Sequence, residues 1–295
     1  MTVSESTRSV SIIGAGVVGT TLACLADRAG YPVVAIASRR VESAHRACGE
    51  LGKDVAKSDP IEAARLGQVV LITTSDSAIA EVCESLARAG AFQPGAVVAH
   101  CSGALSSEVL SPAARRCGAS IASIHPLQTF PSVADAIRHF PGTWCFCEGG
   151  EPAVTILRDL FTKMGARVER IDTPSKVLYH AAGVMACNYV VTLLDAAGEL
   201  ARRAGIEPSW VLTALRPLVT ATIDNVTRTG PAGALTGPIV RGDVNVVEQH
   251  LAEIERVSPE LADLYRRLGR RTLSIVRSKS TLDDVVIERL RGALR

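Results

Sequence analysis

The sequence is poor in aromatic residues and in net charge. Aromatic residues make up 4% of its 295 residues, and 32 basic against 30 acidic residues leave a formal net charge of +2. A charge this small, without a basic stripe, argues against nucleic acid and acidic membrane surfaces as partners. The start, Met1 to Arg8, lacks an apolar signal-peptide core, and no apolar run approaches the roughly 20 residues of a membrane helix. We therefore expect a cytoplasmic protein outside the membrane.

The sequence also lacks a recognisable metal site. Its eight cysteines form no Cys-x-x-Cys pair, and Cys145 and Cys147 have no second pair or histidine cluster to complete four ligands. Zinc at this pair is the alternative to reduced, mostly buried thiols. We predict no metal.

What the chain does contain, from Val10 to about Ile171, is a series of short apolar runs separated by helix-length segments. The runs are Val10–Ile13, Val33–Ala37, Val69–Thr73, Ala96–His100, Ser120–Ile124, Trp144–Phe146 and Val168–Ile171. Such runs are typical of a parallel sheet covered on both faces by helices. The pattern predicts a doubly wound Rossmann α/β domain over residues 1–172.

The strand patterns stop after Asp172. Thr173 followed by Pro174 is typical of a helix start. Helical patterns then run to about Ala204 and over 209–227, 244–256, 259–277 and 281–294, with a Gly/Pro-rich loop from Thr229 to Asp243. We expect an all-helical domain over residues 173–295.

The motif GAGVVG, residues 14–19, follows the first apolar run and opens a helix. Gly14 permits a tight turn, Gly16 lets the backbone approach a pyrophosphate, and Gly19 lets helix and strand pack closely. Amide groups at Val17 and Val18 begin the helix and face the phosphates with its positive dipole end. The motif predicts a dinucleotide site; the alternative is that the glycines only make a turn.

The end of the second run distinguishes the two nicotinamide cofactors. An NAD enzyme usually has an acidic residue there for the ribose hydroxyls, whereas this chain has Ser38, Arg39 and Arg40. A hydroxyl and two guanidinium groups suit the 2′-phosphate of NADP(H). Alternatively, the arginines are the solvated start of the next helix.

Small polar residues follow the third run, at the carboxyl end of its strand. Thr73, Thr74 and Ser75 lie where ligands of open α/β sheets bind, and we expect them to line the cofactor's path towards the nicotinamide. Asp76 next to them is either part of this lining or an N-cap of the following helix.

Two further strand ends carry histidines. His100 precedes Ser102 and Gly103, and His125 precedes Gln128. Imidazole titrates near neutral pH, so either histidine is a candidate proton donor or substrate ligand. A structural role, satisfying loop backbone groups, is the alternative that we favour for His100. We predict His125 as catalytic or substrate-binding, and Ser102, Gly103 and Gln128 as substrate-binding.

The helix after the Rossmann domain presents a third group of candidates. Lys176, His180, Gly183 and Cys187 follow steps of four, three and four residues and share one face, with Asn188 on its flank. Lys176 and His180 are candidate catalytic residues, and Asn188 is a candidate substrate ligand. The alternative is a solvent-exposed first turn without a function.

The loop LTGPIVRGD, residues 235–243, is more specific than a simple connection needs. Arg241 is a candidate clamp for a substrate carboxylate. Asp243 either orients that arginine or caps the next helix.

These motifs resemble a bacterial family of Rossmann-like proteins with a C-terminal helical domain of unknown function. The residues that carry the resemblance are GAGVVG, HCSGALSSEVL, SIHPLQTF, KVLYHAAGVMACNYVVTLLDAA and LTGPIVRGDV. The chain is also similar to a superfamily that includes ketopantoate reductase, 6-phosphogluconate dehydrogenase, pyrroline-5-carboxylate reductase, β-hydroxyacid dehydrogenases and deazaflavin-linked NADP oxidoreductases.

The resemblance implies roles for particular residues. Lys176 matches the catalytic lysine of the hydroxyacid enzymes by position, but His180 stands where those enzymes have an asparagine. His125 resembles a substrate-contacting histidine of prephenate dehydrogenases. The superfamily implies a homodimer formed through the helical domain.

Together these observations predict an NADPH-dependent reductase of a small carbonyl acid, with ketopantoate as the first candidate. The alternatives are an imine or cyclic-amine reductase and an NADP-binding regulatory protein without turnover.

Overall fold

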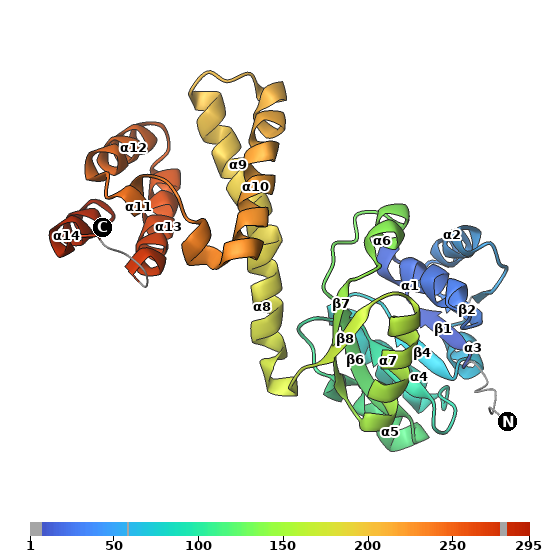
Figure 1. The fold of residues 1–295 in the computed structure, drawn as a ribbon. Coiled ribbons are helices and arrows are strands. Elements are labelled where there is room, and N and C mark those ends of the chain that lie inside the picture. Colours follow the sequence, from blue (N-terminus) through green and yellow to red (C-terminus); the bar gives the residue numbers. More distant parts are fainter. Residues whose placement is uncertain (1–7, 58, 278–281) are drawn as a thin grey trace. The chain divides into compact units, whose positions relative to one another are not determined.

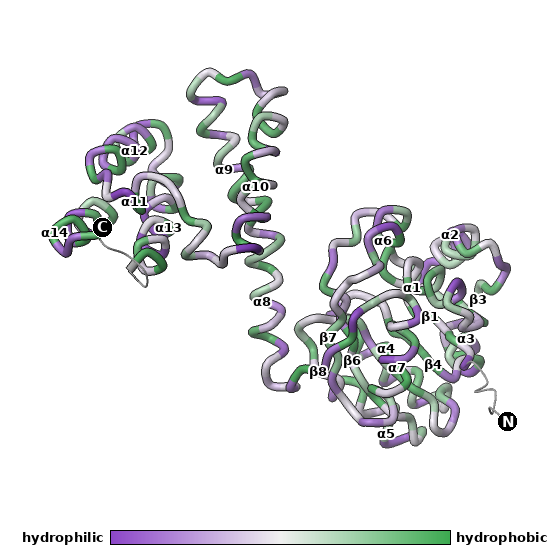
Figure 2. Tube along the Cα trace, viewed as in Figure 1, coloured by the Kyte–Doolittle hydropathy of each residue, from purple (hydrophilic) through white to green (hydrophobic). Residues whose placement is uncertain are grey.

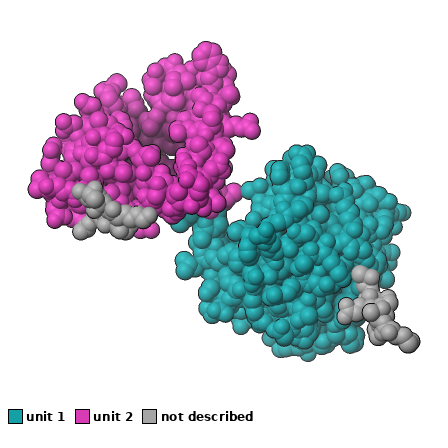
Figure 3. All heavy atoms as spheres, in the orientation of Figure 1, with its two compact units in different colours: residues 1–185 teal, residues 186–295 magenta. Residues whose placement is uncertain are grey.

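The computed structural model describes residues 8–57, 59–277 and 282–295. The chain divides into two compact units, Met1–Met185 and Ala186–Arg295, coloured separately in Figure 3. The first is the Rossmann-type unit and the second is helical.

The first unit is built on an eight-stranded, mostly parallel sheet. Its strand order is β3-β2-β1-β4-β5-β6-β7-β8, and only β7 runs antiparallel to its neighbour β6 (Figure 1). The strands are β1 (Val10–Ile13), β2 (Val33–Ala37), β3 (Ala56–Lys57), β4 (Val69–Ile72), β5 (Val97–His100), β6 (Ser120–Pro126), β7 (Trp144–Gly149) and β8 (Arg167–Arg170). The predicted doubly wound fold is confirmed.

Helices cover both faces of this sheet because alternate side chains of its central strands point to opposite sides. Val69 and Leu71 belong to one buried cluster, whereas Val70 and Ile72 belong to the other. The first cluster includes residues of α1, α2 and α7, and the second includes residues of α3, α4 and α5. The helices of this unit are α1 (Val17–Arg28), α2 (Val41–Leu51), α3 (Pro60–Leu66), α4 (Asp76–Arg88), α5 (Ser111–Cys117), α6 (Val133–His139), α7 (Glu151–Lys163) and α8 (Lys176–Ala186).

The second unit contains helices alone among its described residues. Its core is an apolar cluster shared by α11, α12, α13 and α14, with Val247 and Leu290 fully buried. The helices are α9 (Asn188–Arg203), α10 (Pro208–Ala234), α11 (Pro238–Arg241), α12 (Val244–Val257), α13 (Pro259–Arg277) and α14 (Asp284–Ala293). The predicted start of the last helix, at residue 281, lies outside the described residues.

The structure differs from the sequence prediction at several element boundaries. The two-residue strand β3 was missed, and the helix predicted from Pro174 to Ala204 is divided into α8 and α9 at Cys187. The loop predicted from Thr229 is partly helical, since α10 continues to Ala234 across non-helical Gly230. The compact units divide after Met185, beyond the predicted boundary at 172–173, because the first turns of α8 bind to the sheet.

One stretch, Thr173–Arg203, is long and apolar enough to cross a membrane by length and composition, which the sequence prediction had excluded. The break at Cys187 interrupts it. Lys176 near its start is fully buried against the Rossmann sheet. Length and composition alone are therefore a weak indication of a membrane span.

Candidate functional site

A cleft of about 640 Å³ lies at the carboxyl ends of the central strands of the first unit. Its lining combines three predicted segments: the glycine turn after β1, the arginine pair after β2 and the polar residues after β4. The predicted residues in the lining are Gly14, Gly16, Ser38, Arg39, Arg40, Thr73, Thr74 and Ser75. Val17, Val18 and Gly19 lie behind the turn, in the first turn of α1.

Each of the three glycines in the motif has a different structural role. Gly14 has a φ of +120°, and a Cβ atom there would lie 2.7 Å from the carbonyl carbon of Thr73. At Gly19 a Cβ atom would overlap the carbonyl oxygen of Gly14, so only glycine allows this close packing of helix and strand. No described atom lies within 4 Å of a Cβ placed on Gly16, so this backbone borders open space. Because a helix leaves its first amides without intrahelical acceptors, α1 offers them there to an anion.

The arginine pair also lines the cleft. The side chains of Arg39 and Arg40 are exposed, and Ser38 is half-buried. Arg40 is also the N-cap residue of α2, so these residues do begin the next helix while lining the cleft. The two interpretations of this segment are compatible.

The residues after β4 hold the glycine turn in place. The Thr73 hydroxyl donates a 2.7 Å hydrogen bond to the carbonyl oxygen of Gly14. The Thr74 hydroxyl is buried and has no hydrogen-bond partner among the described residues. Since an unpaired buried hydroxyl is costly, it is a candidate donor or acceptor for a ligand in the cleft. Ser75, and not Asp76, is the N-cap residue of α4.

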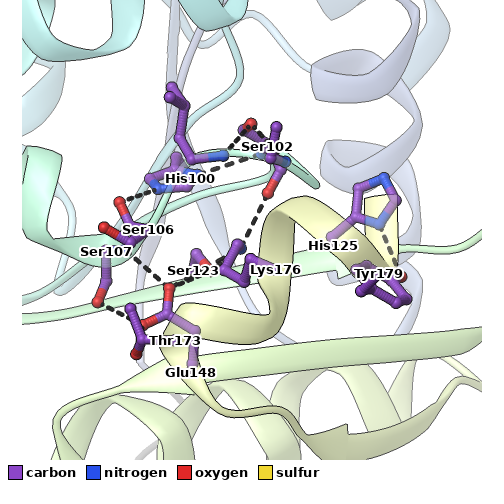
Figure 4. Close-up of polar contacts among 12 residues, drawn as sticks. His100, Ser102, Ser106, Ser107, Ser123, His125, Glu148, Thr173, Lys176 and Tyr179 are labelled. Carbon is purple, nitrogen blue, oxygen red and sulfur yellow. Dashed lines mark hydrogen bonds and ion pairs between the residues drawn. The ribbon is translucent and has the colours of Figure 1, made fainter. Parts of the chain in front are cut away.

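Beyond these residues, Lys176 lies in a buried polar network. Its ammonium donates to the carbonyl oxygen of Ser102 at 3.1 Å and to the Ser123 hydroxyl, and it lies 3.8 Å from Glu148 Oε1 (Figure 4). Only 1% of Lys176 is exposed. Burial lowers the pKa of Lys176, partly offset by the charge of Glu148. This closed environment differs from a solvent-exposed first turn, and the catalytic role of Lys176 stays a prediction.

Glu148 at the end of β7 completes this network and was missed by the sequence prediction. It accepts hydrogen bonds from the Ser107 backbone amide and from the hydroxyls of Ser107, Ser123 and Thr173. Burial raises its pKa, but these hydrogen bonds outweigh burial and leave the pKa below its usual value. A glutamate in the otherwise apolar strand sequence WCFCEG was the available signal, because a buried carboxylate needs partners.

His100 has the structural role that we favoured. Its Nδ1 accepts from the Ser102 amide at 3.1 Å, so its Nε2 carries the hydrogen and donates to the carbonyl oxygen of Ser106. Burial lowers its pKa to about 4, which keeps the imidazole neutral at pH 7. Ser102 is held further, because its hydroxyl donates to Asp76 Oδ2 at 2.7 Å.

His125, Tyr179 and His180 form a second polar cluster next to this loop. His125 Nδ1 shares a 2.8 Å hydrogen bond with the Tyr179 hydroxyl (Figure 4). The ring centroids of His125 and His180 are 5.7 Å apart. A Cβ atom on Gly103 would overlap His180 Nδ1 and lie 3.0 Å from His125 Nε2. Burial lowers the pKa of His125 to about 4. Tyr179 was missed, although it precedes His180 and lies one helical turn after Lys176.

Three predicted substrate ligands are not brought to this cluster by the described contacts. The Gln128 side chain donates to the carbonyl oxygen of Ala136 and accepts from the Thr143 hydroxyl, so it holds its own loop. Asn188 and Arg241 belong to the second unit, and both are exposed. Arg241 pairs with Asp243 at 2.7 Å, so Asp243 orients the arginine and makes no side-chain cap.

Family comparisons assign both parts of the chain. Residues 2–126 match the family model for a Rossmann-like domain, and residues 143–272 match that for a domain of unknown function, DUF2520. Each of the two models covers less than half of the chain. The DUF2520 match begins at the start of β7, so this region includes part of the sheet as well as helices. Among curated proteins, none matches this chain.

Solved structures with the same fold extend over almost the whole chain. A Bacteroides fragilis protein named as an NADP oxidoreductase is 24% identical, with a TM-score of 0.72, covering 92% of this chain and 98% of its own. A Thermotoga maritima protein is 26% identical, with a TM-score of 0.70 and coverages of 92% and 99%. An imine reductase from Pseudomonas sp. is 20% identical, with a TM-score of 0.64 and coverages of 98% and 100%. These similarities establish the fold.

Proposed function

We propose that this protein is an NADP(H)-dependent oxidoreductase that reduces a small carbonyl or imine substrate. The observation that carries the proposal is the cleft that joins the glycine turn, the arginine pair and the polar end of β4. The names of two proteins with the same fold, an NADP oxidoreductase and an imine reductase, support it. We also propose membership of the ketopantoate reductase and 6-phosphogluconate dehydrogenase-like superfamily.

The residues of the cleft fit the cofactor. Amides of Val17 and Val18 at the start of α1 bind the pyrophosphate beside Gly16, whose open backbone permits close approach. Arg39 and Arg40 bind the 2′-phosphate through charge-assisted hydrogen bonds. When bound, NADPH supplies the hydride.

The strand-end cluster, by which we mean the polar side chains around the turn at Ser102 and Gly103, supplies the groups that meet the substrate. His125 and His180 lie against Gly103, and Tyr179 holds the His125 ring through Nδ1. Lys176 acts through Ser102, because its ammonium binds that carbonyl oxygen from inside the protein. The substrate-binding roles of Asn188 and Arg241 stay predictions.

Two substrate classes follow from this assignment. A small 2-oxo acid such as ketopantoate is the candidate from the sequence, and it needs a cation for its carboxylate. Lys176 is buried and bound to three partners, so it is not available as that cation. An imine needs no carboxylate clamp, and the shared fold with an imine reductase supports this second candidate.

We further propose that the protein is a cytoplasmic homodimer. Large apolar side chains are exposed on α8, α9 and α10, where Figure 2 shows many hydrophobic residues. Leu178 is 78% exposed, Val191 66% and Trp210 67%. A second copy that covers these faces removes them from water.

The test is NADPH oxidation, followed by absorbance, against 2-oxo acids and cyclic imines, with NADH in parallel. We expect turnover with NADPH preferred, and tight NADPH binding in a companion titration. Replacing Arg39 and Arg40 with Ala should weaken NADPH binding about ten- to a hundredfold while leaving NADH binding unchanged. Arg115→Ala on exposed α5 is the control.

Failure to bind either nucleotide would refute the proposal. Tight NADPH binding without reduction of any substrate favours the regulatory protein. If the native protein binds NADH and NADPH equally well, the arginine pair does not select between the two cofactors.

A further inference from the structure

The strand-end cluster includes an acidic group, Asp76, whose position is fixed from two directions. Asp76 is the first residue of α4, and its Oδ2 accepts the 2.7 Å hydrogen bond from the Ser102 hydroxyl. Ser102 is anchored on its other side, because its carbonyl oxygen accepts from Lys176. The same hydroxyl also accepts from the amides of Ala104 and Leu105. The carboxylate is therefore held at a well-ordered turn.

The two histidines lie against the next residue of that turn. The backbone of Gly103 borders His180 Nδ1 and His125 Nε2 so closely that no Cβ atom fits. The carboxylate of Asp76 contacts Ser102, and the two imidazoles contact Gly103. The Cα atoms of these consecutive residues are about 3.8 Å apart, so the carboxylate and the imidazoles lie at neighbouring positions. The charge of Asp76 also acts on the pKa of His125, with those of His180 and Lys176 from α8. A small ligand at Gly103 thus encounters a carboxylate beside imidazoles.

Two groups of this cluster, His125 and Tyr179, are poor acids at neutral pH. Burial lowers the pKa of His125 to about 4, and it also lowers the pKa of Lys176. Burial raises the pKa of the Tyr179 phenol. Reduction of a carbonyl requires a proton for the developing alkoxide, and a good acid has a pKa near the working pH. His125 and Tyr179 do not meet that condition, and Lys176 is enclosed by Ser102, Ser123 and Glu148.

We propose that Asp76 binds the positively charged nitrogen of a protonated imine, and that the substrate class of this reductase is a small iminium ion. The proposal rests on the reductase function proposed above. Hydride adds to the iminium carbon, the C=N π pair becomes the lone pair of nitrogen, and NADPH becomes NADP⁺. The nitrogen already carries its proton, so the product is a neutral amine and no protein acid is consumed.

The charge of Asp76 also disfavours the competing substrate class. A 2-oxo acid carries a carboxylate at neutral pH, which Asp76 repels. The Ser102 hydroxyl that donates to Asp76 is uncharged, so this hydrogen bond brings no positive charge to the carboxylate. The substrate cation supplies the missing counter-charge.

The test removes this charge while keeping the hydrogen bond. Asp76→Asn retains an oxygen that accepts from Ser102, and Glu84→Gln removes a charge from the surface of the same helix, where Glu84 pairs with Arg88. The probe is 1,1-dimethylpyrrolidinium, whose charge is independent of pH, titrated calorimetrically into NADP⁺-loaded protein. We expect binding at least tenfold weaker in Asp76→Asn and unchanged in Glu84→Gln. Cyclopentanone, which is uncharged, should bind equally to all three proteins.

Turnover distinguishes this inference from the proposed function. We expect the native enzyme to reduce an N-methylated cyclic iminium at a rate that stays constant from pH 7 to 9, with Asp76→Asn impaired. Reduction of 2-oxo acids but not of the iminium overturns the inference and leaves the reductase standing. Equal probe binding by Asp76→Asn and native protein also overturns it. Asp76-dependent probe binding without reduction of any substrate supports the cation site and refutes the reductase.

Discussion

The two compact units treat apolar and charged residues in opposite ways. All residues of β1 and β4 in the first unit are buried, whereas α10 of the second unit, with 27 residues, buries only Val211. The first unit also contains a buried lysine–glutamate pair, while the ion pairs of the second, such as Arg256–Glu253, are exposed. The comparison teaches that the sheet of the first unit is covered by its own helices, whereas α10 presents apolar surface that has no cover among the described residues.

The largest expected effect concerns the buried pair of the first unit. Lys176→Met should lower the free energy of unfolding of this unit by about 3–5 kcal/mol, because Glu148 stays buried without its counter-charge. The measurement is urea unfolding followed by Trp144 fluorescence in a Trp210→Phe background. Lys163→Met, in a half-exposed pair with Asp159, should cost much less than Lys176→Met, because solvent screens an exposed pair. If both variants lose the same free energy of unfolding, the buried pair contributes no more to stability than the exposed pair.

We expect a loss of stability of intermediate size when the pH is lowered. The pKa of His100 falls from 6.5 to about 4 in the folded protein because of burial, so the unfolded chain binds its proton first as the pH falls. His100 therefore contributes stability that is present above pH 6.5 and is lost between about pH 6.5 and 4. The loss amounts to about 3 kcal/mol. Denaturant unfolding at several pH values should show this extra loss in the native protein relative to His100→Gln. Parallel pH profiles for the two proteins would show that folding leaves the pKa of His100 unchanged.

The smallest effect tests the exposed surface of the second unit. Leu218 on α10 is 65% exposed, and Leu218→Lys should raise the dimer dissociation constant about ten- to a hundredfold by removing one buried leucine from the interface. Val285→Lys on α14 changes a residue of 67% exposure outside α8–α10 and should leave dissociation unchanged. Sedimentation measures both constants. A native protein that stays monomeric at all concentrations would show that this surface has another partner or none.

The nucleotide cleft is the part of the candidate site that local sequence predicts best. Gly14, Gly16, Arg39 and Thr73 each follow a buried strand directly, so their place at the sheet edge follows from strand order alone. Parallel strands bring their carboxyl ends to one edge, and backbone atoms make much of the binding surface. Such a site depends little on distant side chains, which is why a short motif indicates it.

The strand-end cluster could be recognised only from the tertiary structure. Lys176 and Glu148 are 28 positions apart, and the contact that makes Lys176 a buried support was invisible in a helical pattern that only shows which residues share a face. Tyr179 and His125 likewise meet only because the first turns of α8 pack on β6 and β7. The spacing of residues along a helix shows which of them share a face. Their burial and protonation depend on what covers that face.

The sequence by itself determined the Rossmann α/β architecture, the helical region behind it and the residues around the cleft, because hydrophobic periodicity and glycine requirements are local properties of the chain. Only the tertiary structure decided that Lys176 is buried in a polar network, that burial lowers the pKa of His100 and of His125, and that Asp76 and two histidines contact the same turn. These properties arise from desolvation and from contacts between distant segments, which no local pattern encodes.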